Sequence, residues 1–274
     1  MNKGFKIFAK PYIVWLALLA ILPMFVMLIL AFMYSEGLSF EEAYFTFFQF
    51  QMLGEYSILT AFFNSFLYAT ITTVISLVLG YFVAYNVHKS KFKNKFLILT
   101  ILILPMWSNL LLRIEALGNL MEPNNIITQW LNINGDLSIK GTMPAVIIGL
   151  VLTYMPFMIL SVYTALEKID YSLEEAALDL GLTPMQKFWK VIFPLSLKGV
   201  ATGSILVFLP SMSGFAIPEF LGSGNILLIG NVIEAAFRNM DYNLGSLLSV
   251  ILLFVILGAL IIVSKVDKEG ETLL

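Results

Sequence analysis

The sequence contains no cysteine and a single histidine, His88, in 274 residues. Disulfide bonds, thiolate chemistry, haem ligation and the usual zinc sites need these side chains, so the sequence excludes them. Charged residues are also scarce, at 12% of the chain against about 25% in soluble domains. The net charge of −2 is too small to indicate a nucleic-acid-binding protein. His88 itself has two interpretations, a proton relay or a solvated residue beside a basic turn.

Apolar residues make up 59% of the chain, and the mean hydropathy is +0.89. These residues fall in runs long enough to cross a bilayer core of about 30 Å, so the lipid bilayer is the expected surrounding. The first run is longer than the roughly 7–15 residues of a signal-peptide core, and we expect it to be retained. The predicted fold class is an all-α integral membrane protein, with one transmembrane domain over residues 1–274. Six membrane-spanning segments are predicted: 11–33, 59–87, 96–112, 143–165, 198–218 and 245–264.

The basic residues are distributed unequally over this topology. Of the 16 lysine and arginine residues, all but Arg113, Lys140 and Arg238 fall on the side that carries both termini. Cytoplasmic loops of membrane proteins are enriched in lysine and arginine. The sequence therefore predicts that both termini are cytoplasmic. In the fifth segment, Gly199 and Gly203 form a small-xxx-small pair, which indicates close helix packing.

The most informative segment is the polar loop of about residues 166–197, on the predicted cytoplasmic side. It reads as two short helices. Ser172 can cap the first, with Glu175 completing a capping box, and Gly181 can end it in a left-handed conformation. Thr183 and Gln186 form a second box. The apolar stripes are Leu173, Ala176, Ala177 and Leu180 in the first helix, and Met185, Phe188, Trp189 and Ile192 in the second. A surface protrusion of this kind needs a partner groove.

The same residues carry a family resemblance. Glu175-Ala176-Ala177, Gly181 six residues after Glu175, and the run Val191 to Pro194 resemble the EAA loop of ATP-binding-cassette (ABC) importer permeases. The resemblance implies a type I ABC importer permease fold with this loop docked on an ATP-hydrolysing subunit. Each residue also has a local structural interpretation, as a capping acid, packing residues and a helix terminator. The residues implied in ATPase coupling are Glu175, Ala176, Ala177, Gly181, Phe188 and Pro194.

The sequence has no GxxxxGK[ST] phosphate loop, so we expect no enzymatic activity and no bound cofactor in this chain. The resemblance implies that ATP and magnesium bind a separate ATPase subunit, present as a dimer on the cytoplasmic face. It further implies a second, non-identical permease subunit and an extracytoplasmic binding protein. The expected location is the bacterial inner or plasma membrane.

Two further stretches concern the cargo. The segment from Pro105 to Leu131 and the segment from Phe215 to Ile233 resemble B-type permease subunits of spermidine/putrescine importers. The chain reads IPEFLGSG from Ile217, a departure from the family pattern that leaves the particular polyamine open. The resemblance implies polyamine cargo and a polyamine-binding protein. Thiamine, ferric iron or a phosphonate is the alternative cargo within the same class of importer.

The predicted outer face carries ten acidic residues against three basic ones, which would attract a cationic substrate electrostatically. A shortage of lysine in outer loops would give the same excess. Ionisable residues near membrane depth are often functional, but aromatic residues in a span often only pack, and Arg113 with Glu115 could simply face water. The candidate substrate-pathway residues are Trp107, Glu115, Tyr154, Glu219 and Asp241.

Two other classes of protein remain possible from the residues alone. A channel or ion-coupled carrier would transport without an ATPase and leaves the EAA-like loop unexplained. A membrane scaffold would give no substrate phenotype when deleted.

Overall fold

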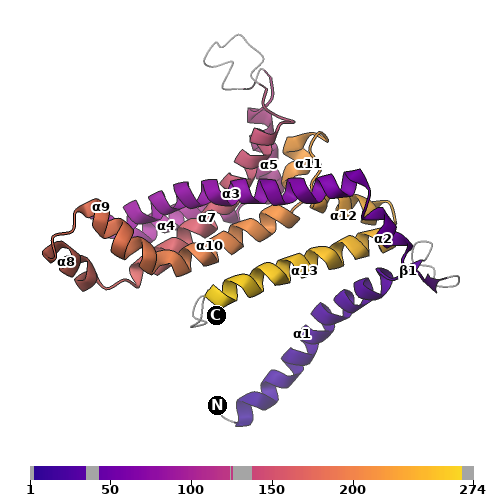
Figure 1. Ribbon diagram of the computed structural model, residues 1–274, viewed down its shortest axis with the longest axis horizontal. Coiled ribbons are helices and arrows are strands. Elements are labelled where there is room, and N and C mark those ends of the chain that lie inside the picture. The colour runs from indigo at the N-terminus through magenta and orange to yellow at the C-terminus, as the bar shows by residue number, and fades with distance from the viewer. Residues whose placement is uncertain (1–2, 35–42, 124, 126–137, 267–274) are drawn as a thin grey trace. The chain divides into compact units, whose positions relative to one another are not determined.

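The computed structural model describes residues 3–34, 43–123, 125 and 138–266 (Figure 1). The chain divides into two compact units. The first comprises Met1–Ala61 and Val232–Val255, and the second comprises Phe62–Asn231 and Ile256–Leu274. Helix is the dominant secondary structure of the described residues in both units.

The first unit contains α1 (Lys3–Leu30), a two-stranded sheet and α2 (Phe48–Met52). Strand β1 (Met33–Tyr34) pairs antiparallel with β2 (Tyr44–Phe45), and Met33 lies opposite Phe45. This unit also holds the start of α3 (Tyr56–Lys89), most of α12 (Ile229–Arg238) and the start of α13 (Tyr242–Val266). Ala31, Leu247 and Val250 form its buried core.

Five helices are long and apolar enough to cross a membrane: Pro11–Leu30, Tyr56–Lys89, Met143–Glu167, Pro184–Ser213 and Tyr242–Ile261. Four of them coincide with the predicted segments 11–33, 59–87, 143–165 and 245–264. The two remaining predicted segments differ from the structure in shape or in extent.

The third predicted segment, 96–112, is not one straight helix. Helix α4 (Lys95–Ile103) continues into the 3-10 turn η1 (Leu104–Trp107), and α5 (Leu110–Leu120) then leaves at an angle of 89°. The backbone is extended at Ser108, and the Asn109 side chain caps α5 by accepting hydrogen bonds from the amides of Leu111 and Leu112. Apolar content alone did not reveal this bend, because the leucines at 110–112 continue the apolar run of α4 past it.

The fifth predicted segment, 198–218, begins too late and ends too late. Helix α9 (Pro184–Lys187) passes through a π-helical turn, η2 (Phe188–Ile192), directly into α10 (Phe193–Ser213). Helix α10 ends where Gly214 adopts an extended conformation, and α11 (Ala216–Gly222) follows as a separate short helix. The segment that was predicted as a loop is therefore continuous with a spanning helix.

Helix α7 (Met143–Glu167) forms the centre of the second unit and is its most buried spanning helix. At one end, Ile114, Leu150 and Leu221 join α7 to α5 and α11. At the other end, Met158 and Val162 pack in a core that includes Tyr81 of α3. The predicted close packing at Gly199 is confirmed, since a Cβ atom there would lie 2.4 Å from the Cβ of Ala165 on α7.

Candidate functional site

Residues 170–197, which we call the α8–α9 segment, contain α8 (Tyr171–Asp179), α9 and η2, and lead into α10. Figure 1 shows α8 and α9 at the end of α7 and α10 that lies away from α5 and α11. Helix α8 is capped by Asp170, whose carboxylate accepts a 2.9 Å hydrogen bond from the amide of Ser172. That hydrogen bond holds the pKa of Asp170 below its ordinary value.

The predicted cap at Ser172, with Glu175 completing a box, is therefore wrong. The helix starts one residue before Ser172, which lies inside the first turn rather than ahead of it. Asp170 is at least as good a cap as serine, and its negative charge also favours the helix N-terminus.

The predicted turn and second cap are confirmed. Gly181 has a φ of +79°, a left-handed conformation that glycine adopts without strain, and its amide donates to the Leu178 carbonyl at 2.9 Å. Thr183 and Gln186 form the complete capping box, with the two hydrogen bonds at 3.3 and 3.0 Å. The direction of α9 relative to α8 is thus fixed by local hydrogen bonds that the sequence signals directly.

Most of the apolar side chains of the α8–α9 segment are exposed. Ala177 and Ile192 are buried, whereas Leu180 is 84% exposed and Trp189 is 55% exposed. The exposed large apolar residues of the segment are Tyr171, Leu173, Leu178, Leu180, Met185, Trp189, Leu195 and Leu197. Of the residues implied in coupling, Glu175, Ala176, Gly181 and Pro194 are exposed, Ala177 is buried and Phe188 is half-buried. A concentration of apolar surface on two short helices is typical of a protein-binding surface.

Glu174 is a functional candidate that the sequence reasoning missed. Its side chain is only 4% exposed and forms ion pairs with Lys89, at the end of α3, and with Lys187 of α9, the latter at 3.0 Å. Burial would raise the pKa of Glu174, but hydrogen bonds from both ammonium groups hold it below its ordinary value. Two adjacent acids in the sequence could not show which one faces inward. The sequence signal that could have identified Glu174 is its two lysine partners. Lys89 lies far away in the sequence, and Lys187 lies in the next helix.

An aromatic cluster makes a second connection between this segment and α3. The ring of Phe188 lies 5.7 Å from that of Tyr81 and 5.3 Å from that of Tyr85, in edge-to-face geometry. The Tyr81 hydroxyl is hydrogen-bonded to the hydroxyl of Ser196 at 2.8 Å. Phe188, implied in coupling by the resemblance, therefore packs its ring against α3.

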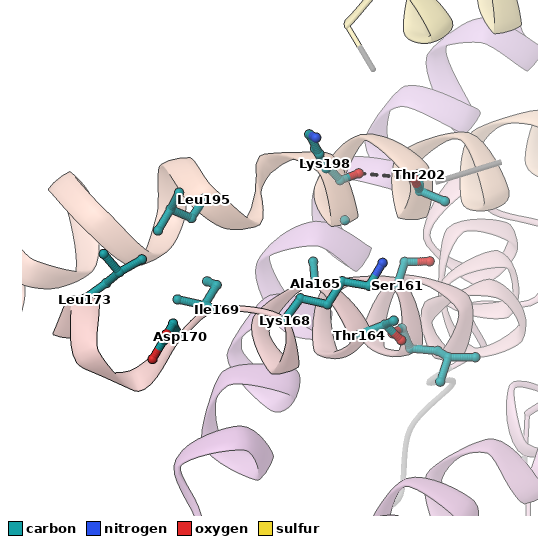
Figure 2. Close-up of a pocket in the computed structure, with 12 residues that line it drawn as sticks. Ser161, Thr164, Ala165, Lys168, Ile169, Asp170, Leu173, Leu195, Lys198 and Thr202 are labelled. Carbon is teal, nitrogen blue, oxygen red and sulfur yellow. Dashed lines mark hydrogen bonds between the residues drawn. The ribbon is translucent and has the colours of Figure 1, made fainter. Parts of the chain in front are cut away.

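A cavity of about 600 Å³ lies where α7 ends, α8 begins and α10 starts. Figure 2 shows Ser161 and Thr164 of α7 and Thr202 of α10 among its lining residues, with the Thr202 hydroxyl donating to the Lys198 carbonyl at 3.1 Å. Leu173 also lines this cavity, so open space separates the start of α8 from α10. A second cavity, of about 490 Å³, lies beside Glu174 and is lined by Tyr85, His88, Lys95 and Tyr171 among others.

The structure places His88 differently from the solvated residue predicted for it. It lies in the last turn of α3, is half-buried, and its ring centroid is 6.3 Å from that of Tyr163. The solvated interpretation is therefore wrong. Helix α3 extends to Lys89, past the predicted end of the span at residue 87, and this places the His88 ring against Tyr163 of α7.

The candidate pathway residues of the second unit have different environments. Trp107 is 88% exposed at the end of η1, and Glu115 is exposed on α5. Tyr154 is partly buried and packs against both apolar cores of this unit. Glu219 is exposed on α11, and its carboxylate accepts a 3.1 Å hydrogen bond from Asn231, which is itself buried. Of these four, Glu219 is the acid whose position is fixed by a buried partner.

Asp241 belongs to the first unit. Its carboxylate accepts a 3.1 Å hydrogen bond from the amide of Leu244, so it caps the N-terminus of α13. Capping is a structural role that the sequence reasoning did not assign to Asp241. The acidic residues predicted on the outer face at positions 36, 41, 42 and 136 lie outside the described residues.

Residues 76–266 match the family described as binding-protein-dependent transport system inner membrane component. The chain belongs to this family. The matched region contains the whole α8–α9 segment and the ends of α3, α7 and α10 that adjoin it. This inner membrane component is a multi-pass protein of the inner membrane, and it is a transport subunit.

Two curated relatives are similar over nearly the whole chain. The spermidine/putrescine transport system permease protein PotB of Haemophilus influenzae is 36% identical over 254 residues, which are 91% of this chain and 89% of the relative. PotB of Escherichia coli K12 is 35% identical over the same share of this chain and 92% of its own. The inner membrane component and these relatives therefore correspond along almost all of their length.

Solved structures are similar in fold. A chain of a bacterial ABC transporter involved in import of the acidic polysaccharide alginate superposes with a TM-score of 0.80, over 98% of this chain and 97% of that chain, at 16% identity. A structure of bacterial alginate ABC transporter in complex with a pentasaccharide-bound periplasmic protein gives a TM-score of 0.77, over 94% and 92% of the two chains, also at 16% identity. The inner membrane component thus has the fold of ABC importer permeases.

Proposed function

We propose that this inner membrane component is the permease subunit of an ABC importer that carries polyamines, spermidine or putrescine, into the cytoplasm. The observation that carries the proposal is the identity of 35–36% with spermidine/putrescine permeases over 91% of the chain. The energy comes from ATP and magnesium bound to a separate ATPase subunit. This chain binds neither and catalyses no reaction.

The α8–α9 segment is the docking site for that ATPase. Its exposed apolar residues, among them Leu180 and Trp189, supply a surface for a partner groove, and Gly181 and Thr183 set the angle between its two helices. Glu175, Ala176 and Pro194 are exposed on the same segment and are available to the partner. This assignment puts the segment and both termini in the cytoplasm, with the bent pair α4–α5 serving as the third of six spans.

The remaining partners follow from the class of transporter. A second, non-identical permease subunit completes the pathway, and two ATPase subunits bind the two permeases. An extracytoplasmic binding protein delivers the polyamine, a role that is supported by the periplasmic protein bound in the alginate transporter complex.

Glu219 is the first candidate for a cargo contact. Polyamines are cations, and a carboxylate that is exposed but held by a buried side chain, as Glu219 is by Asn231, provides a fixed negative charge. Glu115 and Trp107 are exposed in the same unit and could contribute charge and an aromatic face, whereas Asp241 already has its capping role.

Uptake of labelled spermidine and putrescine by cells that lack this gene tests the proposal. We expect uptake to be lost on deletion and to return with the wild-type gene, while a gene carrying Glu219→Gln should restore it with a KM raised by about ten-fold, the loss of one charged contact. Uptake of a labelled amino acid by the same cells serves as the control. Polyamine uptake that is unaffected by the deletion would contradict the cargo assignment and would favour thiamine, ferric iron or a phosphonate.

A further inference from the structure

Glu174 connects three separate helices through one buried carboxylate. The residue is only 3% exposed, and it pairs with Lys89 on the last turn of α3 and with Lys187 on α9. Glu174 itself lies on α8. It directly precedes the exposed Glu175, so the acid of the recognised motif and the acid that holds the segment in place are different residues.

The energetics make this arrangement sensitive to change. A buried carboxylate is strongly unfavourable unless opposite charges and hydrogen bonds compensate it, and removing one member of such a group leaves the others uncompensated. The titratable and charged groups that line the 490 Å³ cavity together with Glu174 are Lys89, Lys187, Lys95, His88, Tyr85 and Tyr171. Lysines outnumber carboxylates in this set, so the loss of Glu174 would leave like charges facing one another.

An aromatic contact also attaches the α8–α9 segment to α3. Phe188 of η2 packs on Tyr81 and Tyr85, which lie on α3 about two turns and about one turn, respectively, before Lys89. By contrast, the 600 Å³ cavity separates Leu173, at the start of α8, from Leu195 and Lys198 of α10. Within the described residues, the ion pairs of Glu174 therefore attach α8 to α3 and to α9, and not directly to α10.

We propose that Glu174 is a positioning residue that fastens the α8–α9 segment to the Lys89 end of α3, so that movement of the segment is passed to α3 as well as to α10. The inference rests on the proposed function, because the movement is the one that an ATPase partner would impose. Without the pairing to Lys89, α8 would reach α3 only indirectly, through α9 and the contacts of Phe188 and Ser196 with α3. The ion pairs give α8 its own attachment to the Lys89 end of α3, in addition to its attachment to α9.

The absence of cysteine in the sequence allows a direct distance measurement. Cysteines are introduced at Asn86 of α3 and Ser172 of α8, two exposed positions, and are spin-labelled. Pulsed electron paramagnetic resonance then measures the distance between the two labels and so the separation of the two helices. The sample is the complete complex, purified through a tag on this chain, without nucleotide and with ATP trapped. We expect one narrow distance that is the same in both states.

Two lysine variants separate the proposed role from a general loss of structure. Lys89→Gln removes the pairing with α3 but leaves Glu174 paired with Lys187, so the distance should broaden or shift in the ATP state. Lys187→Gln leaves the α3 pairing in place and should keep the narrow distance. Asp179→Asn, an exposed acid on the same helix, is the matched control for loss of a carboxylate. An unchanged distance in both Lys89→Gln and Glu174→Gln would overturn the proposal.

The functional arm measures the spermidine transported per ATP hydrolysed. For Lys89→Gln and Glu174→Gln we expect this ratio to fall by about ten-fold, with normal recovery of the ATPase subunit and an unchanged spermidine KM. A role that is only structural would instead lower recovery of the complex, and an unchanged ratio would overturn the proposal. If the wild-type complex moves no polyamine, the proposed cargo fails, and the distance measurement still tests the attachment.

The pairing should persist throughout the cytoplasmic pH range. The pKa of Glu174 is held below its ordinary value of 4.5, so its contribution to stability is complete above that value and is lost only as the pH falls through the lowered pKa. The label distance should therefore be the same at about pH 6 and about pH 8. A distance that changes within this interval would contradict an ionised Glu174 as the fastening group.

Discussion

A valine in place of Gly181 should lower spermidine uptake by at least about ten-fold while the chain still inserts into the membrane. Gly181 has a φ of +79°, and no atom lies within 4 Å of the position where a Cβ would be. The substitution therefore causes no collision. Its effect comes from the backbone, because a left-handed conformation costs an L-residue about 1–2 kcal/mol and is particularly unfavourable for a β-branched one. The turn should relax and change the angle between α8 and α9.

Gly224 supplies a matched control for this experiment. It has a φ of +76°, again with no atom within 4 Å of a built Cβ, and it lies in the loop after α11. Gly224→Val should introduce the same local strain without disturbing the ATPase docking site. The measurement is co-purification of the ATPase subunit with the tagged chain, together with uptake. Equal loss of ATPase recovery in both variants would contradict a specific role for the turn at Gly181.

A valine in place of Gly199 should lower the stability of the whole second unit, because it forces α10 away from α7. A Cβ atom at this position would lie 2.4 Å from the Cβ of Ala165 and 2.6 Å from the carbonyl oxygen of Ser161, both on α7. The carbonyl belongs to the backbone, so a side-chain rotation cannot relieve the collision. Forced separation of α7 from α10 should cost about 1–3 kcal/mol, the usual range for overpacking a well-packed interface.

The control for Gly199 is Gly258 of α13, where no atom lies within 4 Å of a built Cβ. Thermal unfolding of the detergent-purified chain, followed by its loss from the monodisperse peak in gel filtration, measures the difference. We expect Gly199→Val to unfold at a clearly lower temperature and Gly258→Val to behave as the wild type. Equal unfolding temperatures for the two variants would contradict the close contact of α7 with α10.

Local signals in the sequence were sufficient for several features of the site. The left-handed turn at Gly181 and the capping box of Thr183 and Gln186 depend on residues within a few positions of one another, so the sequence predicts them. The four long apolar helices that match predicted segments depend only on composition over about 20 residues. The packing at Gly199 could be predicted only in part. Its spacing from Gly203 indicates close helix packing, but it does not identify α7 as the partner helix.

Features that depend on distant residues could not be predicted in the same way. Glu174 and Glu175 are equivalent by composition, and only the arrival of Lys89 from α3, 85 residues earlier, makes the first of them the buried one. Asp170 displaced Ser172 as the cap because both are good capping residues and the tertiary path of the chain after α7 decides between them. The bend between α4 and α5 needed an extended Ser108, which hydropathy does not report.

The polyamine cargo was assigned from sequence identity with relatives and not from the local chemistry of the site. Two of the described acids of the predicted outer face have separate local roles: Glu219 accepts a hydrogen bond from Asn231, and Asp241 caps α13. Identity with the PotB relatives, spread over 91% of the chain, carried the cargo assignment instead. The acidic excess of the predicted outer face agrees with a cationic substrate but would not by itself distinguish a polyamine from another cation.

Reconstituted transport tests the central claim most directly. The complex purified through this chain is placed in liposomes, with ATP and magnesium on the side of the α8–α9 segment and the spermidine-loaded binding protein on the other. We predict that spermidine accumulates on the ATP side, and that accumulation stops when ATP is omitted or replaced by an analogue that cannot be hydrolysed. Equal spermidine entry without ATP, or entry through this chain alone, would contradict the account and would identify a channel or carrier.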